Sequence, residues 1–170
     1  MIDYGYSAVT LDKNIPHKAQ DWRNDPEVRR WCRQTGLITE QHHNNWLKRI
    51  EDPDLDMFGI YVNQSYDAVG VCGLTGIDLV HSKAEFSLYI APRYRGAGYA
   101  SGALKTLLRY GFDELGLNIV WGEVLDPNPA RALFEKLGFV KEGTLRDRYY
   151  KAGRFWDSHM ISIKRSEGLW

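Results

Sequence analysis

The sequence predicts an α/β (α+β) fold, in which helices flank one mixed β-sheet, and three observations lead to this prediction. The chain has 170 residues, the usual size of one domain. Hydrophobic residues make up 44% of it and charged residues 26%, so the chain can bury a core of its own. Along the chain, segments in which apolar and polar residues alternate are followed by segments whose apolar residues recur at helical spacing.

The first half of the chain contains most of the expected strands. Residues 6–11 alternate and predict a first strand. Residues 25–27 (Asp, Pro, Glu) have the residue types of a helix start, and a short helix should follow. Thr39 is a suitable N-cap for a longer helix over residues 40–50. Apolar runs bounded by turn residues then predict three strands, at residues 57–62, 68–79 and 84–90.

The second half continues the alternation and ends in a hairpin. Leucines at helical spacing predict a helix from about Tyr99 to Leu115. A strand over residues 118–125 and a helix over residues 129–137 follow. The last two strands are expected at residues 144–150 and 155–163, with the hairpin turn between them at residues 151–154.

The charge balance excludes several classes of protein. Lys plus Arg number 22 and Asp plus Glu number 22, and this balance argues against a dedicated nucleic-acid binder and against a polybasic membrane anchor. The N-terminus lacks the basic and apolar regions of a signal peptide, and no apolar run approaches the roughly 20 residues that cross a membrane. We therefore expect a cytoplasmic protein with no nucleic-acid partner and no membrane partner.

The cysteines and histidines predict neither a disulfide framework nor a metal site. Cys32 and Cys72 lie far apart in the sequence and are expected as buried thiols. His42 and His43 are adjacent on an expected helix, where they point about 100° apart. Because neither H-x-x-x-H nor C-x-x-C occurs, we expect no metal.

The strongest functional signal is the turn between the strand at residues 84–90 and the helix after it. The turn contains Arg93 and Arg95 together with Gly96 and Gly98. Unpaired backbone N–H groups at the start of a helix bind phosphate, and the helix dipole strengthens this binding. Glycines let the backbone approach the anion without a Cβ in the way.

Other interpretations of this turn fit less well. A dinucleotide-binding fingerprint would need glycine or alanine where Ser101 stands, and a P-loop would need a G-K-[ST] ending that is absent. A plain turn with surface arginines is the structural alternative. The remaining interpretation is a site for the pyrophosphate of coenzyme A.

Several segments, in order, resemble the GNAT family of N-acetyltransferases, and the resemblance covers nearly the whole chain. The matching segments are the strand at residues 84–90, the R-x-x-G-x-G turn at 93–98 with the helix after it, the run at 121–124, and the run at 128–139. Residues 141–150 resemble the branch of ribosomal-protein N-terminal and spermidine acetyltransferases. Residues 22–29, residues 38–42 and Trp46 resemble acetyltransferases that act on amino groups of nucleotide-linked sugars.

The resemblance implies a single N-acetyltransferase domain over residues 1–170, with a mixed, mostly antiparallel sheet whose fourth and fifth strands splay apart. The pantetheine arm of acetyl-CoA, the implied cosubstrate, would lie in the splay, where a backbone N–H would face the thioester oxygen. The glycine turn would bind the pyrophosphate. The implied coenzyme A contacts are Leu88, Tyr89, Ile90, Arg93, Arg95, Gly96, Ala97, Gly98, Tyr99, Ala100 and Asn128.

The reaction needs a general base, because a protonated amine has no lone pair with which to attack. Glu123 stands on the fifth strand where some family members place that base, and Glu85 on the fourth strand is the second candidate. Burial would raise the pKa of either carboxylate toward neutrality. The structural alternative for each is a strand carboxylate that pairs with a nearby arginine.

One position departs from the family pattern. Where relatives often carry a tyrosine that protonates the leaving thiolate, this chain has Phe134, which has no proton to give. Tyr149 or Tyr150 would donate the proton instead, or water would. Because a thiol with a pKa of about 8.5 is a fair leaving group, we expect loss of the acid to slow the reaction rather than abolish it.

We therefore expect an acetyl-CoA-dependent N-acetyltransferase that acts on a small-molecule or peptide amine by direct transfer in a ternary complex. The acceptor classes left open are an amino-sugar nucleotide, a polyamine and a protein N-terminus. The alternatives are a non-catalytic coenzyme A-binding regulatory module and an acyltransferase for longer acyl chains. Trp22, Trp31 and Trp46 either pack in the core or wall the acceptor pocket. The exposed edges of such a sheet also favour a homodimer.

Overall fold

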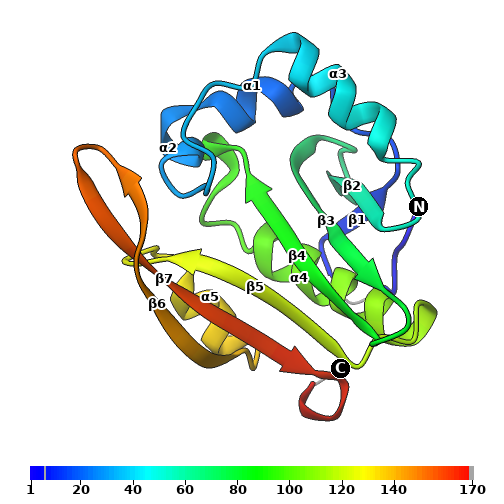
Figure 1. The fold of residues 1–170 in the computed structure, drawn as a ribbon. Coiled ribbons are helices and arrows are strands. Elements are labelled where there is room, and N and C mark those ends of the chain that lie inside the picture. Colours follow the sequence, from blue (N-terminus) through cyan, green and yellow to red (C-terminus); the bar gives the residue numbers. More distant parts are fainter. Residues whose placement is uncertain (6, 169–170) are drawn as a thin grey trace.

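In a computed structural model, which describes residues 1–5 and 7–168, the chain forms one seven-stranded sheet with helices on both faces (Figure 1). The strand order is β1-β2-β3-β4-β5-β7-β6. Neighbouring strands are antiparallel except β4 and β5, which are parallel. The mixed, mostly antiparallel sheet is thus confirmed. In the described ranges no helix is long and apolar enough to span a membrane.

The helices and strands, in chain order, are β1 (Val9–Asp12), α1 (Ala19–Asn24), α2 (Pro26–Arg29), α3 (Glu40–Arg49), β2 (Leu55–Val62), β3 (Ala68–Asp78), β4 (Lys83–Ile90), α4 (Tyr99–Arg109), β5 (Ile119–Leu125), α5 (Arg131–Lys136), β6 (Val140–Lys151) and β7 (Arg154–Lys164).

The two faces of the sheet are covered by different helices. On one face α4 buries an apolar stripe that includes Leu104 and Leu107, both fully buried, against the main core. On the other face α1 and α3 contribute Ala19 and Trp46 to a smaller cluster around Met57 of β2. Figure 1 shows α1, α2 and α3 together at one end of the strands, with α4 behind the sheet. Because the cluster on this face is small, it does not fill the space between the sheet and the N-terminal helices, and a cavity lies there.

The fourth and fifth strands diverge after a short paired stretch. They pair over only three positions, which end at Glu85 and Trp121. Beyond these residues β4 continues to Ile90 and β5 continues to Leu125. The predicted splay is therefore present, and it leaves part of the β4 edge open in the middle of the sheet.

Several element boundaries differ from the predicted ones where the apolar pattern is short or broken. Helix α1 was not predicted, because its six residues bury only Ala19 and Trp22 and show no periodicity. Helix α4 gives way to a π-helical turn at Tyr110–Glu114 instead of continuing regularly. Strand β6 begins at Val140, earlier than predicted. Its first residues are exposed and do not alternate, so the apolar pattern did not indicate a strand there. Tyr6, the predicted start of the first strand, lies outside the described residues.

Phe86 keeps the strands apart where they diverge. Its ring lies against Gly122 of β5, and a Cβ at that glycine would meet Phe86 Cζ at 2.8 Å. Phe134 and Phe139 pack around the same ring, with centroids 5.2 and 5.1 Å away. Phe134 is therefore a core residue, and the tight aromatic cluster leaves Phe86 little room to move.

Replacing Gly122 by Ala should destabilise the fold by about 1–3 kcal/mol, because the added methyl overpacks a site that cannot relax. The melting temperature should fall by several degrees in thermal unfolding. Gly143→Ala is the matched control, since a Cβ there meets nothing within 4 Å. Equal melting temperatures for the two variants would contradict the wedge role of Phe86.

Candidate functional site

The glycine turn after β4 has the geometry of an anion cradle. Gly96 and Gly98 both have φ of +82°, a left-handed conformation that glycine adopts without strain. The first hydrogen bond of α4 runs from Gly102 N–H to Gly98 O at 3.1 Å. The preceding N–H groups of the first turn, from Tyr99 to Ser101, therefore have no partner within the helix. They are suited to bind phosphate oxygens.

Arg93 and Arg95 flank this turn but differ in their contacts. The Arg93 guanidinium lies over the Tyr94 ring, 4.5 Å from its centroid, and donates to the Tyr94 hydroxyl at 2.6 Å. Arg95 donates to the backbone oxygen of Glu27 at 3.2 Å. Both side chains are exposed. The turn thus carries two cations at its surface, and Arg95 also ties it to α2.

The open edge of β4 presents backbone hydrogen-bonding groups. Ala91 N–H donates to Val69 O of β3 at 2.9 Å. Because backbone groups in an antiparallel pair point alternately toward and away from the partner strand, the N–H groups of Leu88 and Ile90 point away from β3, toward β5. Strand β5 has already diverged at this point. Leu88 and Ile90 therefore offer the backbone groups predicted from the family resemblance.

Tyr89 and Asn128 occupy the predicted places with different surroundings. Tyr89 pairs with Val71 of β3 through its backbone, and its hydroxyl donates to Ala19 O at 3.2 Å. Burial raises the pKa of Tyr89. Asn128 lies in the loop after β5, and its side-chain oxygen accepts a hydrogen bond from Ala130 N–H at 2.9 Å. This contact holds the start of α5 and leaves the amide NH₂ of Asn128 to donate.

The two candidate carboxylates, Glu85 of β4 and Glu123 of β5, form a side-chain cluster with Tyr149 of β6. Glu123 is only 6% exposed and accepts hydrogen bonds from Tyr149 Oη at 2.9 Å and Ser158 Oγ at 2.5 Å. Arg33 lies between the carboxylates, 2.6 Å from Glu85 and 3.5 Å from Glu123. The structural alternative, in which each carboxylate pairs with an arginine, is thus present through Arg33. The same cluster also contains the phenol of Tyr149.

The environment shifts the pKa of two members of this cluster. Burial raises the pKa of Glu85, and the guanidinium of Arg33 opposes that shift. Burial also raises the pKa of Tyr149, as does its hydrogen bond to the Glu123 carboxylate. Both shifts favour the protonated form of the side chain, and Tyr149 is the donor in its hydrogen bond to Glu123.

Sequence reasoning missed Arg33, Ser158 and Lys151. Arg33 follows α2 in a segment without periodicity, so only the tertiary fold places it beside the strands. Lys151 lies at the end of β6 and donates to the backbone oxygens of Arg30 at 2.8 Å and of Cys32 at 2.6 Å. The hairpin that carries Tyr149 is thereby fastened to the segment that carries Arg33.

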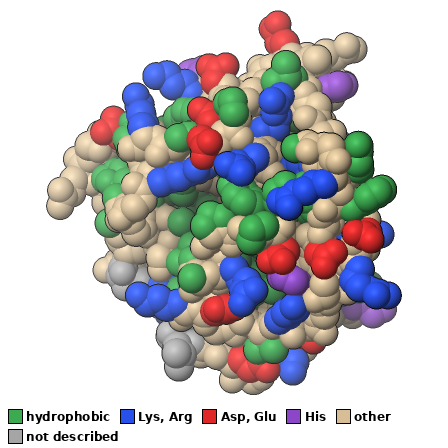
Figure 2. Space-filling view, turned by 90° about the vertical axis from the view of Figure 1, so that its left-hand side faces the viewer, with side chains coloured by type: hydrophobic (Ala, Val, Ile, Leu, Met, Phe, Trp, Pro, Cys, Tyr) green, Lys and Arg blue, Asp and Glu red, His purple; other side chains and the backbone are tan. Residues whose placement is uncertain are grey.

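The other candidate donor, Tyr150, does not join the cluster. It is 62% exposed, and its ring packs on Phe155 across the hairpin at a centroid distance of 5.1 Å. Neighbouring strand residues point to opposite faces, so Tyr149 and Tyr150 cannot both face Glu123. Figure 2 shows the side of the molecule on which this hairpin lies, where Lys and Arg side chains gather around apolar ones.

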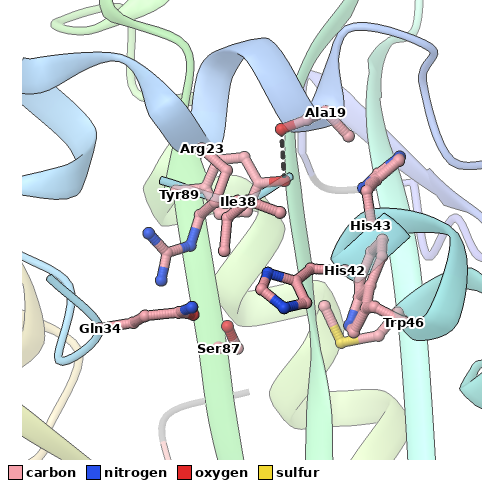
Figure 3. Close-up of a pocket in the computed structure, with 10 residues that line it drawn as sticks. Ala19, Arg23, Gln34, Ile38, His42, His43, Trp46, Ser87 and Tyr89 are labelled. Carbon is pink, nitrogen blue, oxygen red and sulfur yellow. Dashed lines mark hydrogen bonds between the residues drawn. The ribbon is translucent and has the colours of Figure 1, made fainter. Parts of the chain in front are cut away.

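A cavity of about 300 Å³ lies beside this cluster, between β4 and the N-terminal helices (Figure 3). Ser87 and Tyr89 line it from β4, on the same strand face as Glu85. The residues that line it from the other elements are Ala19, Arg23, Gln34, Ile38, His42, His43, Trp46 and Met57. Of the three tryptophans considered as pocket walls, Trp46 is the one that lines this cavity, whereas Trp22 is buried.

In the described ranges no group of three or more His, Cys, Asp or Glu residues is arranged to hold a metal ion.

Comparison with known proteins gives a consistent result. Residues 9–140 match the family model of the acetyltransferase (GNAT) domain. The uncharacterized N-acetyltransferase p20 of Bacillus licheniformis is 33% identical over 153 residues, which are 87% of this chain and 85% of that protein. The spermidine N(1)-acetyltransferase of Vibrio cholerae is 35% identical over 102 residues, 59% of each chain. The crystal structure of Vibrio cholerae spermidine N-acetyltransferase with CoA and spermine superposes with a TM-score of 0.86 at 26% identity, covering 94% of this chain and 97% of that one.

Replacing Arg33 by Gln should raise the pKa of Glu85 further, because the guanidinium favours the ionised carboxylate. As the pH falls, Glu85 should take up its proton at a higher pH in the variant than in the wild type. Carbon-detected NMR titration of the side-chain carboxyl groups measures this shift.

Arg148→Gln is the matched control for this titration. It removes a guanidinium 3.8 Å from Glu123 that does not contact Glu85, so the Glu85 titration should stay in place. A Glu85 titration that Arg33→Gln leaves unchanged would show that the ion pair does not form in solution.

Proposed function

The chain belongs to the GNAT family of N-acetyltransferases, and from this premise we propose that it transfers the acetyl group of acetyl-CoA directly to a primary amine in a ternary complex. The observation that carries the proposal is the open β4 edge, with the glycine turn at its end and the Glu123–Tyr149 pair across the splay. These are the parts that direct acyl transfer needs: an anion site, backbone donors, a base and an acid.

The described residues fit coenzyme A. The first turn of α4 and the cations of Arg93 and Arg95 would hold its pyrophosphate, where Gly96 and Gly98 leave the surface free of Cβ atoms. The backbone of Leu88 would pair with the pantetheine arm along the open edge, and the amide of Asn128 would donate to it. When bound, acetyl-CoA supplies the activated thioester.

The backbone of β4 also supplies a donor for the reaction. Negative charge develops on the carbonyl oxygen when an amine attacks, and a fixed N–H donor stabilises this charge without reorganisation. The N–H groups of Leu88 and Ile90 point into the splay. One of them would serve as this donor, because strand β5 does not occupy it.

Glu123 is the proposed general base. Its carboxylate is nearly buried, and its two oxygens have about four acceptor positions, of which Tyr149, Ser158 and Arg33 use three. One position therefore remains for the proton of the attacking amine. Glu85 is the second candidate, since it lies on the strand face that leads to the cavity and its pKa is raised.

Tyr149 is the proposed acid in place of the family tyrosine at the position of Phe134. As the new C–N bond forms, the amine gives its proton to Glu123. As the C–S bond breaks, Tyr149 gives its proton to the sulfur. Because the Tyr149 hydroxyl is hydrogen-bonded to Glu123 at 2.9 Å, the proton on Glu123 then returns to the phenolate. The cycle closes with no net change in the protein.

The acceptor is proposed to be a small amine that enters through the cavity beside β4. Spermidine acetyltransferases among the relatives act on a small amine, as their names state. The cavity volume of about 300 Å³ is at the lower end of the range for small-molecule sites. It is therefore better matched to a small molecule than to a folded protein.

Saturating acetyl-CoA should raise the melting temperature by roughly 5–10 °C. Ligand at about 100 times its dissociation constant stabilises the folded state by roughly 2.7 kcal/mol, and this is the shift expected for a domain of this size. Thermal unfolding with acetyl-CoA, and with NADPH as the control nucleotide, makes the measurement. Equal shifts with both ligands, or none, would remove the main support for the coenzyme A site.

Glu123→Gln should lower kcat for amine acetylation by about 100-fold or more, because the amine loses its proton acceptor. Acetyl-CoA should bind to the variant as it binds to the wild type, which distinguishes an enzyme from a binding module. Thiol release with a panel of primary amines gives the rate.

Two further variants make the test of the base specific. Glu51→Gln removes an exposed carboxylate far along the chain from the cluster and should leave kcat unchanged. Glu85→Gln should cost less than Glu123→Gln. If Glu85→Gln costs more, the role of base belongs to Glu85.

A further inference from the structure

We propose that the acceptor amine carries an anionic group, a carboxylate or a phosphate, which binds to Arg23 in the cavity beside β4. The inference rests on the proposed function, since it concerns the acceptor of the same transfer reaction. The cavity and the position of Arg23 within it carry the proposal.

The lining of the cavity has cationic and neutral donors but no acid. Its polar side chains are the guanidinium of Arg23, two imidazoles, the amide of Gln34, and the hydroxyl groups of Ser87 and Tyr89. None of its ten lining residues is Asp or Glu. A cavity built for a polycation would be expected to present carboxylates, so this lining favours an anion.

Arg23 is placed to bind such an anion. It lies in the last turn of α1 and is partly buried. In Figure 3 its guanidinium points into the cavity, on the side where the Gln34 amide and the Ser87 hydroxyl lie. Its guanidinium makes no hydrogen bond or ion pair with the part of the chain that the structure describes. A guanidinium with free donors in a cavity is suited to bind carboxylate or phosphate with two parallel hydrogen bonds.

The two carboxylates on the strands beside the cavity already have cationic partners. Glu85 pairs with Arg33, and Glu123 has Arg33 and Arg148 within 4 Å. The positive charge of Arg23 also extends to neighbours, where it lowers the pKa of Lys151 in addition to the larger effect of burial. A polyamine would therefore compete with these arginines for the strand carboxylates.

The spacing along β4 fits an amine and an anion on one small molecule. Glu85 and Ser87 lie on the same strand face, and two residues advance a strand by about 7 Å. The amine would lie near the carboxylates, and the anionic group would lie farther along, at Arg23. Trp46, Met57 and Ile38 supply an apolar wall between these ends. This wall would contact the body of the acceptor.

A binding experiment tests the anion site without knowledge of the natural amine. The protein is first saturated with coenzyme A, so that the glycine turn is filled. Inorganic phosphate and, separately, acetate are then titrated while ¹H–¹⁵N NMR follows Gln34 and the Arg23 side chain. Saturable shifts of Gln34 in the wild type that disappear in Arg23→Gln support the proposal. Shifts that persist in Arg23→Gln, or that are absent from the wild type, overturn it.

A transfer experiment then compares matched amines. Glucosamine 6-phosphate is compared with glucosamine, 6-aminohexanoate with its amide, and spermidine serves as the polycation. We expect kcat/KM to be at least tenfold higher for one anionic member than for its neutral partner, and the two pairs distinguish phosphate from carboxylate. Arg23→Gln should bring this ratio to about one, while Arg49→Gln, on the exposed surface of α3, should leave it unchanged.

The outcomes separate this inference from the proposed function. Preferential acetylation of neutral amines or spermidine would overturn the inference and leave the acetyltransferase activity intact. If acetyl-CoA neither stabilises the protein nor acetylates any amine, the proposed function fails, and the phosphate titration still decides whether Arg23 binds anions.

Discussion

The divergence of β4 from β5 after three paired positions determines the rest of the site. A sheet normally pairs every backbone N–H and C=O of an inner strand, and unpaired groups are costly unless a ligand or water satisfies them. Here the Phe86 ring lies against Gly122, within a cluster with Phe134 and Phe139, so the two strands cannot close. The packing of this aromatic cluster thus keeps the backbone N–H groups along the β4 edge unpaired.

In the proposed function strand β4 serves two sites, because strand geometry separates its backbone edge from its side-chain faces. The edge groups of Leu88 and Ile90 point into the splay. The side chains of Glu85 and Ser87 point toward the N-terminal helices, where the cavity lies. A cosubstrate along the edge and an acceptor in the cavity would therefore meet on the same strand. The hairpin of β6 and β7 completes the arrangement by bringing Tyr149 to Glu123.

The sequence predicted those parts of the site that depend on local pattern. The glycine turn and the strand positions of Glu85 and Glu123 follow from spacing and alternation, and the open edge follows from the family resemblance. The structure has strands in the predicted succession along the chain. Arg33 and Arg23 were not predicted, because a short helix and an irregular segment carry them and only tertiary packing brings these segments to the strands. Tyr149 and Tyr150 were equivalent by pattern until the register of β6 and β7 put one of them on each face.

The two arginines show why a shared fold does not determine the acceptor. Arg33 lies between Glu85 and Glu123 and contacts both, so in the proposed site it is an internal counter-cation for these carboxylates. Arg23 of α1 adds a cation with free donors in the cavity beside β4. Both come from residues 19–39, which contribute no strand to the sheet although they bury Ala19, Trp22 and Val28. A few residues in that segment can therefore change the charge of the acceptor site while the sheet, its splay and the transfer chemistry stay the same.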